Sequence, residues 1–177
     1  MRFSFLIILT LILSASVISQ MKPKTSKTKT VIPDSLATLP METKKNTSDE
    51  DVKYINRMRS EIQKAENTPT DIEPLRRHSA SDIVLIPDGM LPVSGQENAL
   101  NLMKQLWEIF EVKTEYHSEE VKIIGDTAID RGWAKETLKN KKTNEFTENR
   151  LNYLWISKKD KNGIWKQIYV IWNKRSE

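Results

Sequence analysis

The 177-residue chain contains no cysteine. Disulfide bonds, thiolate metal sites and lipid attachment through a cysteine are therefore excluded, and the fold must depend on its core for stability. Glycine is scarce as well, with 5 residues. The segment IPDGMLPVSG at 86–95 holds two of these glycines, but no Lys follows them in the pattern that cradles phosphate groups. We therefore reject a nucleotide-binding loop there.

The chain also lacks a strong charge of one sign in its C-terminal part. Residues 51–177 hold 21 Lys and Arg against 20 Asp and Glu, although the whole chain has a formal charge of +4. Most of the excess lies in residues 22–45. A nearly neutral domain lacks the positive surface by which proteins bind nucleic acids, so we expect no nucleic-acid partner.

No apolar run is long enough to suggest a permanent membrane anchor. Residues 5–13 are apolar except for Thr10, which is shorter than the roughly 20 residues that span a bilayer. Arg2 precedes this run, and residues 17–19, which follow it, are small or otherwise acceptable before a signal-peptide cleavage site. This layout predicts a secretory signal peptide over residues 1–19. We expect an exported protein, periplasmic or secreted, without a stable membrane anchor after cleavage.

Residues 20–49 are rich in Lys, Thr, Ser and Pro and contain no aromatic residue. Such a segment cannot bury enough apolar surface to offset its ordering entropy, and we interpret it as a flexible tether. All five Trp lie between positions 107 and 172. The sequence thus predicts one compact domain over residues 50–177.

Hydrophobic periodicity predicts helices first and strands later. Ile55, Met58, Ile62 and Ala65 form one stripe of a helix over residues 48–66. A capping-box pattern at 70–73 predicts a second, short helix, and a third begins at Gly95. The predicted strands cover residues 83–86, 112–124, 126–139, 146–158 and 164–173. This order indicates an α+β fold.

The order of these elements, together with GDTAIDRG at 125–132, NGIWKQI at 162–168 and VIWN at 170–173, resembles the nuclear transport factor 2-like superfamily. The likeness is greatest to its SnoaL-like and ketosteroid isomerase-like domains. The resemblance implies a cone-shaped α+β fold, with three N-terminal helices packed on a strongly curved antiparallel or mixed sheet around an apolar cavity. Many members are homodimers, and their functions range from isomerases to ligand carriers.

The resemblance also places Ile86 where the isomerase branch has its aspartate base. The branch's tyrosine position falls at Ile62 or Gln63, and its second acid falls near Asn152. None of these side chains can replace a carboxylic acid in proton transfer, so we do not expect the isomerase mechanism. Whether the protein is an enzyme stays open.

Asp130 is the acidic residue considered most closely for a role in the cavity. Alternation puts it on one face of its strand with Ala128, Gly132 and Ala134, where small residues would leave space for a ligand. The alternative, which we favour, is that Asp130 faces solvent on the convex side or pairs with Arg150 or Arg131. Asp82 is interpreted as a residue that ends a turn.

The last strand should be apolar on both faces. Strict alternation puts Trp165, Gln167, Tyr169 and Ile171 on one face, and Lys166, Ile168, Val170 and Trp172 on the other. One face would line the cone and the other would be covered most simply by a second subunit. Trp155, Trp165 and Trp172 are core candidates. His78 and His117, the only histidines, lie in no ligand-like spacing, so we expect neither a metal site nor another cofactor.

We thus expect an exported, homodimeric cone that binds a small apolar or amphipathic molecule. The positions predicted to line the cavity are Ile62, Ile86, Trp107, Asp130, Asn152, Val170 and Trp172. One alternative is an isomerase, cyclase or hydrolase that uses Asp130 as its base, with Tyr153, Tyr169 or Trp133 shaping the substrate site. The other is a homodimeric interaction module with a filled cavity, tethered by residues 20–49.

Overall fold

The computed structural model describes residues 47–175, so the predicted signal peptide and most of the predicted tether lie outside the described residues. Helices α1 (Thr47–Glu66) and α2 (Glu73–His78) precede the first strand, and α3 (Gln96–Ile109) precedes the long strands. The strands are β1 (Ser79–Ile86), β2 (Val93–Ser94), β3 (Phe110–Ile124), β4 (Thr127–Asn140), β5 (Phe146–Lys159) and β6 (Trp165–Lys174). The predicted order of helices and long strands is confirmed.

Two local predictions differ from the structure. Helix α2 begins at Glu73, the last residue of the capping-box pattern, but its N-cap residue is Ile72, which makes no side-chain capping bond. Strand β1 begins directly after α2, so the exposed Asp82 lies inside a strand and does not end a turn. The segment at 86–95 also contains the short strand β2, which pairs with β1.

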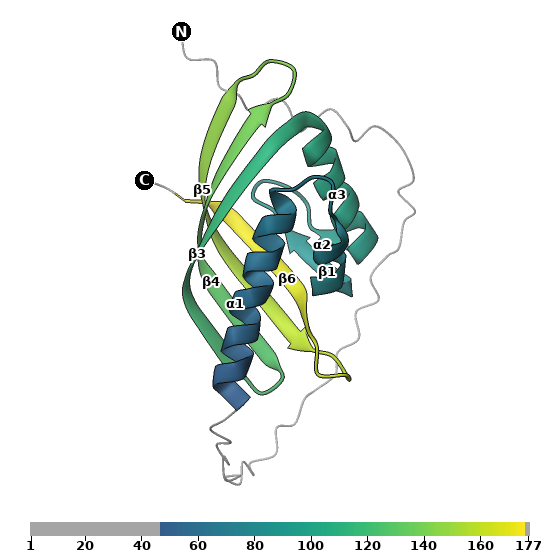
Figure 1. Cartoon of the computed structure of the whole chain (residues 1–177), viewed down its shortest axis with the longest axis vertical. Coiled ribbons are helices and arrows are strands. Elements are labelled where there is room, and N and C mark those ends of the chain that lie inside the picture. Colours follow the sequence, from purple (N-terminus) through teal and green to yellow (C-terminus); the bar gives the residue numbers. More distant parts are fainter. Residues whose placement is uncertain (1–46, 176–177) are drawn as a thin grey trace, which may run out of the picture. The chain divides into compact units, whose positions relative to one another are not determined.

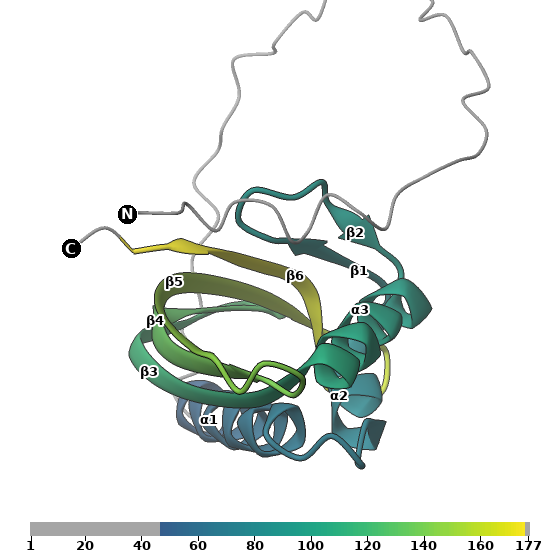
Figure 2. The ribbon, with the colours of Figure 1, turned by 90° about the horizontal axis from the view of Figure 1, so that it is seen from above.

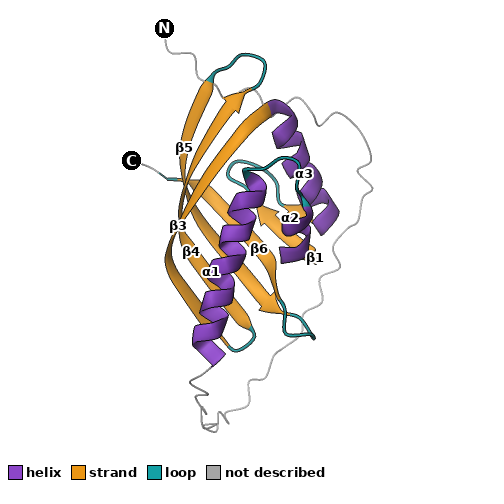
Figure 3. Cartoon of the chain, viewed as in Figure 1, coloured by secondary structure: helices purple, strands orange, loops and turns teal. Residues whose placement is uncertain are grey.

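The strands form one six-stranded sheet in the order β2-β1-β6-β5-β4-β3. Strand β1 runs parallel to β6, and the other neighbouring pairs are antiparallel. The sheet is strongly curved, with α1 lying along one side of it and α2 and α3 next to β1 (Figures 1 and 3). The sheet is mixed and does not close into a barrel, which confirms the predicted cone-like α+β fold class.

Helix α1 covers what we call the inner face of the sheet; the opposite side is the outer face (Figure 2). The predicted stripe of α1 is buried, with Ile55, Met58 and Ile62 exposing 2% or less of their surface. These residues pack against Trp155 and Trp165, both in the core. Burying large aliphatic and aromatic side chains is the dominant favourable contribution to folding. No helix among residues 47–175 has both the length and the apolar character of a membrane span.

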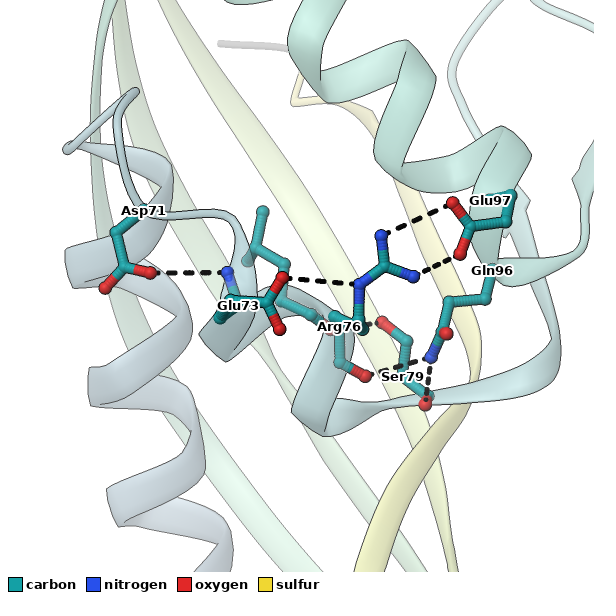
Figure 4. Close-up of polar contacts among 7 residues, drawn as sticks. Asp71, Glu73, Arg76, Ser79, Gln96 and Glu97 are labelled. Carbon is teal, nitrogen blue, oxygen red and sulfur yellow. Dashed lines mark hydrogen bonds and ion pairs between the residues drawn. The ribbon is translucent and has the colours of Figure 1, made fainter.

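A set of polar contacts fastens α2, β1 and α3 together at one corner (Figure 4). Arg76 of α2 pairs with Glu97 at the start of α3 and with Glu73 one turn back. The side-chain amide of Gln96 donates to the carbonyls of Arg76 and Ser79, at 2.9 and 2.8 Å. The two bonds from Gln96 satisfy backbone carbonyl groups at the corner where two helices and a strand meet.

Two β-bulges decide which side chains face inward. In β3 the pairing register with β4 shifts between Ser118 and Glu120. In β6 it shifts at Ile168, because Gln167 pairs with Ser157 whereas Tyr169 pairs with Ile156. The strict alternation predicted for β6 is therefore wrong: Trp165 and Gln167 face inward before the bulge, and Val170 and Trp172 after it.

Gly132 is required by the bulge in β3. A Cβ atom at this position would lie 2.0 Å from the carbonyl oxygen of His117, which belongs to the backbone of β3. We expect Gly132→Ala to lower the free energy of unfolding by about 3 kcal/mol, because the β3 backbone must move. Gly89→Ala is the control: its site is open, and only the positive φ of 68° opposes a side chain. That variant should lose about 1 kcal/mol. Equal losses in urea unfolding would contradict this role of Gly132.

Candidate functional site on the inner face of the sheet

Side chains of directly paired residues lie on the same face of a sheet, so the pairing register assigns the inner face. On β4, Ala128, Asp130, Gly132 and Ala134 are all buried, whereas Ile129 and Arg131 are more exposed. The predicted grouping of these small residues around Asp130 is confirmed. The same alternation continues to Glu136, which therefore also faces inward.

Asp130 is buried, with 2% of its surface exposed, and accepts three side-chain hydrogen bonds. Arg59 Nε of α1 donates to it at 2.9 Å, Ser118 Oγ of β3 at 2.7 Å and the Tyr153 hydroxyl of β5 at 3.2 Å. The favoured prediction, that Asp130 faces solvent or pairs with Arg150 or Arg131, is wrong. Its true partner lies in another element, 71 positions away in the chain.

The environment of Asp130 is that of a fixed ion pair. Both carboxylate oxygens are engaged, and the paired Arg59 side chain is itself only 13% exposed. Burial, followed by the charge of Asp130, raises the pKa of Tyr153 to about 12, so this phenol stays protonated and donates. The inner face therefore carries a buried charge whose hydrogen bonds and ion pair are provided by the protein itself.

A second polar group lies nearer the end of α1. The Tyr116 hydroxyl of β3 donates to the carboxyl group of Glu66, with distances of 2.9 and 3.1 Å to its two oxygens. On the same face, Asn149 Nδ2 donates to Glu136 Oε2 at 2.9 Å. Glu66, Tyr116 and Glu136 are only partly buried. Among the described residues, neither glutamate has a basic side chain within salt-bridge distance.

The pKa values of this second group are shifted toward the neutral forms. Burial raises the pKa of Glu66 to about 8, and the charge of Glu136 adds to the shift while the Tyr116 hydrogen bond opposes it. Burial also raises the pKa of Glu136, and it raises that of Tyr116 well above its usual range. At neutral pH Glu66 is therefore mostly a protonated carboxylic acid, able to donate or accept a hydrogen bond.

Aromatic rings connect the two polar groups. Tyr116 contacts Tyr153 and Trp155 edge-on, with ring centroids 5.3 and 4.8 Å apart. Trp107 of α3 donates its indole N–H to the backbone carbonyl of Glu66 at 2.9 Å, which holds the end of α1 in place. The carboxyl–phenol pair thus lies against a wall of packed aromatic rings.

Beyond this wall the inner face is apolar but not fully buried. The pairing register places Val112, Leu138, Leu151 and Trp172 on the inner face, and each of them keeps intermediate exposure. Solvent therefore still reaches apolar side chains on the inner face, where they are available to contact a ligand.

The residues predicted to line the cavity fall into two groups. Ile62 is buried in the core, Trp107 is buried beside Glu66, and Val170 packs against the core. Asp130 and Trp172 also face inward, as described above. In contrast, Ile86 pairs with Ile171, and Asn152 pairs with Trp133 and Asn173, on the outer face. The placement of Ile86 and Asn152 thus differs from the expectation that they line the cone.

The two histidines contribute to neither polar group. His78 is buried and its Nε2 lies 2.8 Å from Glu61 Oε2, and burial lowers its pKa. His117 stacks on Trp133 on the outer face, with ring centroids 3.8 Å apart. No cluster of three or more His, Asp or Glu side chains within the described range has the arrangement of a metal site.

Removing one partner of the Arg59–Asp130 pair should destabilise the protein strongly. Replacing either partner alone leaves an uncompensated group in the interior, so we expect Asp130→Asn and Arg59→Met each to lower the free energy of unfolding by about 3 kcal/mol. The double variant should lose much less than the sum, because it leaves no charge unpaired. Additive losses in a urea-unfolding double-mutant cycle would show that the two groups do not act together.

Glu66 should make stability depend on pH. Its carboxyl keeps its proton in the folded protein up to a pKa of about 8, compared with 4.5 in an unfolded chain. The unfolded state therefore binds fewer protons between these values, and the free energy of unfolding falls as pH rises through this window. Glu66→Gln should remove most of this decline, gaining about 3 kcal/mol over the unmodified protein at pH 8.

The measurement is urea unfolding at intervals from pH 5 to pH 8. The exposed Glu108 of α3 provides the control, and Glu108→Gln should follow the unmodified protein at every pH. In Glu66→Gln the free energy of unfolding should still decline slightly as pH rises, because the pKa of Glu136 is also raised. If the free energy of unfolding declined equally with pH in Glu66→Gln and in the unmodified protein, the raised pKa of Glu66 would be contradicted.

Comparison with known proteins gives matches in structure only. No family model matches the chain, and no curated protein matches it significantly in sequence. A ketosteroid isomerase-like protein from Erwinia carotovora atroseptica is similar, with a TM-score of 0.66 and 22% identity over 73% of this chain and 99% of that chain.

Two further solved structures have comparable similarity. A nuclear transport factor 2-like superfamily protein from Salmonella enterica serovar Typhimurium gives a TM-score of 0.67 at 9% identity, covering 73% of this chain and 94% of that one. A hexachlorocyclohexane dehydrochlorinase from Novosphingobium barchaimii gives 0.65 at 14% identity, covering 73% and 89%. At these identities the likeness concerns the fold and not the activity. The described part of the chain has the nuclear transport factor 2-like fold.

Proposed function

We propose that the domain binds a small amphipathic molecule on the concave inner face of the sheet. The observation that carries this proposal is a set of inward-facing, partly exposed apolar side chains next to the Glu66–Tyr116 pair. The apolar part of the ligand would contact Leu138, Leu151 and Trp172. Its polar end would exchange hydrogen bonds with the protonated carboxyl group of Glu66. Pockets of this composition, mostly apolar with few polar groups, are typical of small-molecule sites.

The geometry supports binding better than catalysis by Asp130. An active base must reach the substrate, but Asp130 is only 2% exposed. Three of its roughly four acceptor positions are already used by Arg59, Ser118 and Tyr153. Among the structural neighbours, the dehydrochlorinase is an enzyme by name. Its low identity to this chain transfers no residue roles.

We further propose that the protein acts after export, in the periplasm or outside the cell. The support is the sequence of residues 1–19, with its short apolar run and small residues at the cleavage position. Its ligand would then be a molecule found in that compartment. The balanced charge of residues 51–177 supports the absence of a nucleic-acid partner.

The neutral amphipathic fluorophore N-phenyl-1-naphthylamine tests the binding site. We expect it to bind the unmodified protein, and we expect Leu151→Trp, which fills the inner face, to weaken binding at least about tenfold. Leu154→Trp is the matched control, because Leu154 lies on the same strand but on the outer face. Circular dichroism establishes that both variants are folded. Equal binding by the two variants would place the probe elsewhere and contradict the proposal.

A further inference from the structure

The acidic side chains of the inner face differ in whether the chain supplies them with a base. Asp130 has the guanidinium group of Arg59 at 2.9 Å. Glu66 and Glu136 lie on the same side of the sheet, and in the part of the chain that the structure describes no Lys, Arg or His comes within salt-bridge distance of either. Each of these two carboxyl groups thus lacks a positive partner, which a ligand can provide.

Most of the hydrogen-bonding capacity of Glu66 is also unused. A carboxylate has roughly four acceptor positions. Between described residues Glu66 receives one side-chain donor, the Tyr116 hydroxyl, which lies 2.9 and 3.1 Å from its two oxygens. Glu136 likewise receives one, Asn149 Nδ2 at 2.9 Å. A ligand group with several hydrogen-bond donors would satisfy the acceptors that remain.

The aromatic side chains near Glu66 suit a positively charged group. Tyr116 packs edge-on against Tyr153, and Tyr153 pairs with the inward-facing Trp172 of β6. Tyr116 and Trp172 both keep intermediate exposure. Aromatic rings attract cations through their negative faces. Because Arg59 is already paired with Asp130, its charge is compensated where a second cation would enter the inner face.

We infer that the polar end of the ligand is a protonated amine, which the carboxylate of Glu66 binds as an ion pair. This inference rests on the proposed function, because it concerns the same site. Charge complementarity carries it: an ammonium group has three N–H donors and no acceptor, and the site offers acceptors without a base. A hydroxyl group would bring only one donor, and a carboxylate none.

Binding of an amine must release a proton. A free alkylamine resembles the Lys side chain, whose usual pKa is about 10.4, and is protonated at neutral pH. Glu66 is then mostly a neutral acid, because burial raises its pKa to about 8. When the ammonium group pairs with the Glu66 carboxylate, the carboxyl proton passes to the solvent. The affinity for an amine should therefore rise about tenfold per pH unit below pH 8 and level off above it.

The other groups that face Glu66 do not reverse this trend. The titratable ones are Tyr116 of β3 and Glu136 of β4; Trp107 of α3 contacts the Glu66 carbonyl but does not titrate. Burial raises the pKa of Tyr116 well above its usual range, so this phenol keeps its proton. The pKa of Glu136 is raised as well, and its ionisation adds negative charge that attracts the same cation.

Decylamine and 1-decanol test the inference, because they share one alkyl chain and differ at the polar end. Their affinities follow from displacement of N-phenyl-1-naphthylamine from the full chain at pH 8. We expect decylamine to bind at least about tenfold more tightly than 1-decanol. Partition alone would favour the alcohol, because burying an unpaired ammonium group costs more than burying a hydroxyl group. Glu66→Gln should remove the preference, and the exposed control Glu108→Gln should keep it.

Calorimetric titration with decylamine at pH 7, in two buffers of different ionisation enthalpy, counts the protons released. We expect close to one per amine for the unmodified protein and for Glu108→Gln, and few for Glu66→Gln. Leu151→Trp should weaken the binding of decylamine together with that of the fluorophore.

The possible failures of the two proposals can be told apart. If the fluorophore binds on the inner face but decylamine binds no better than 1-decanol, or releases no proton, the inference is overturned and the proposed function stands. The inference is also overturned if Glu66→Gln keeps the preference for the amine. If neither decyl compound nor the fluorophore binds, both proposals fail.

Discussion

Helix α1 is fixed to the sheet by an apolar stripe and by polar side chains spaced along its length. Asp51 near its start, Arg59 in its middle and Glu66 at its end each bind a side chain of a different strand region. The central contact is the ion pair with Asp130, which is buried at the middle of the inner face. A buried charge of this kind requires its partner, so the ion pair specifies one position of the helix on the sheet.

The same helix also protects the open edge of the sheet. Strand β3 lies at that edge, and unpaired backbone groups there would invite another strand. Asn67 binds both the N–H and the carbonyl of Thr114, and the side chain of Gln63 accepts the N–H of Tyr116. These bonds fix the backbone of Tyr116, whose hydroxyl then meets Glu66 one turn along the helix. The edge and the candidate site are therefore stabilised by neighbouring residues at the end of α1.

Periodicity explains what could be predicted from the sequence. The 3.6-residue repeat of Ile55, Met58 and Ile62 and the two-residue repeat around Asp130 are local patterns, and both survive in the structure. Extending the second repeat from Ala134 by two residues would also have identified Glu136 as inward-facing. The partner of Asp130 had no such signal, because Arg59 belongs to a different periodic segment 71 positions away.

The wrong faces predicted for the end of β6 have their origin in a bulge. A single extra residue at Ile168 exchanges the faces of every later residue of β6, so a strict alternation assigns Val170 and Trp172 to the same face as Lys166. No residue type at Ile168 marks the shift, because isoleucine is also common in regular strands. Sequence periodicity thus determines which strands exist here, whereas only the register determines which of their side chains reach the site.

The two acids of the inner face differ because their partners differ. Asp130 faces the guanidinium group of Arg59 at 2.9 Å, so a positive partner lies next to it where it is buried. Glu66 faces a phenol that burial keeps neutral, and its own burial favours the protonated acid below a pKa of about 8. The wall next to the apolar surface is therefore uncharged at Glu66 near neutral pH. Above that pKa the added negative charge would oppose an anionic ligand, so the chemistry of this wall favours a neutral polar group over a carboxylate.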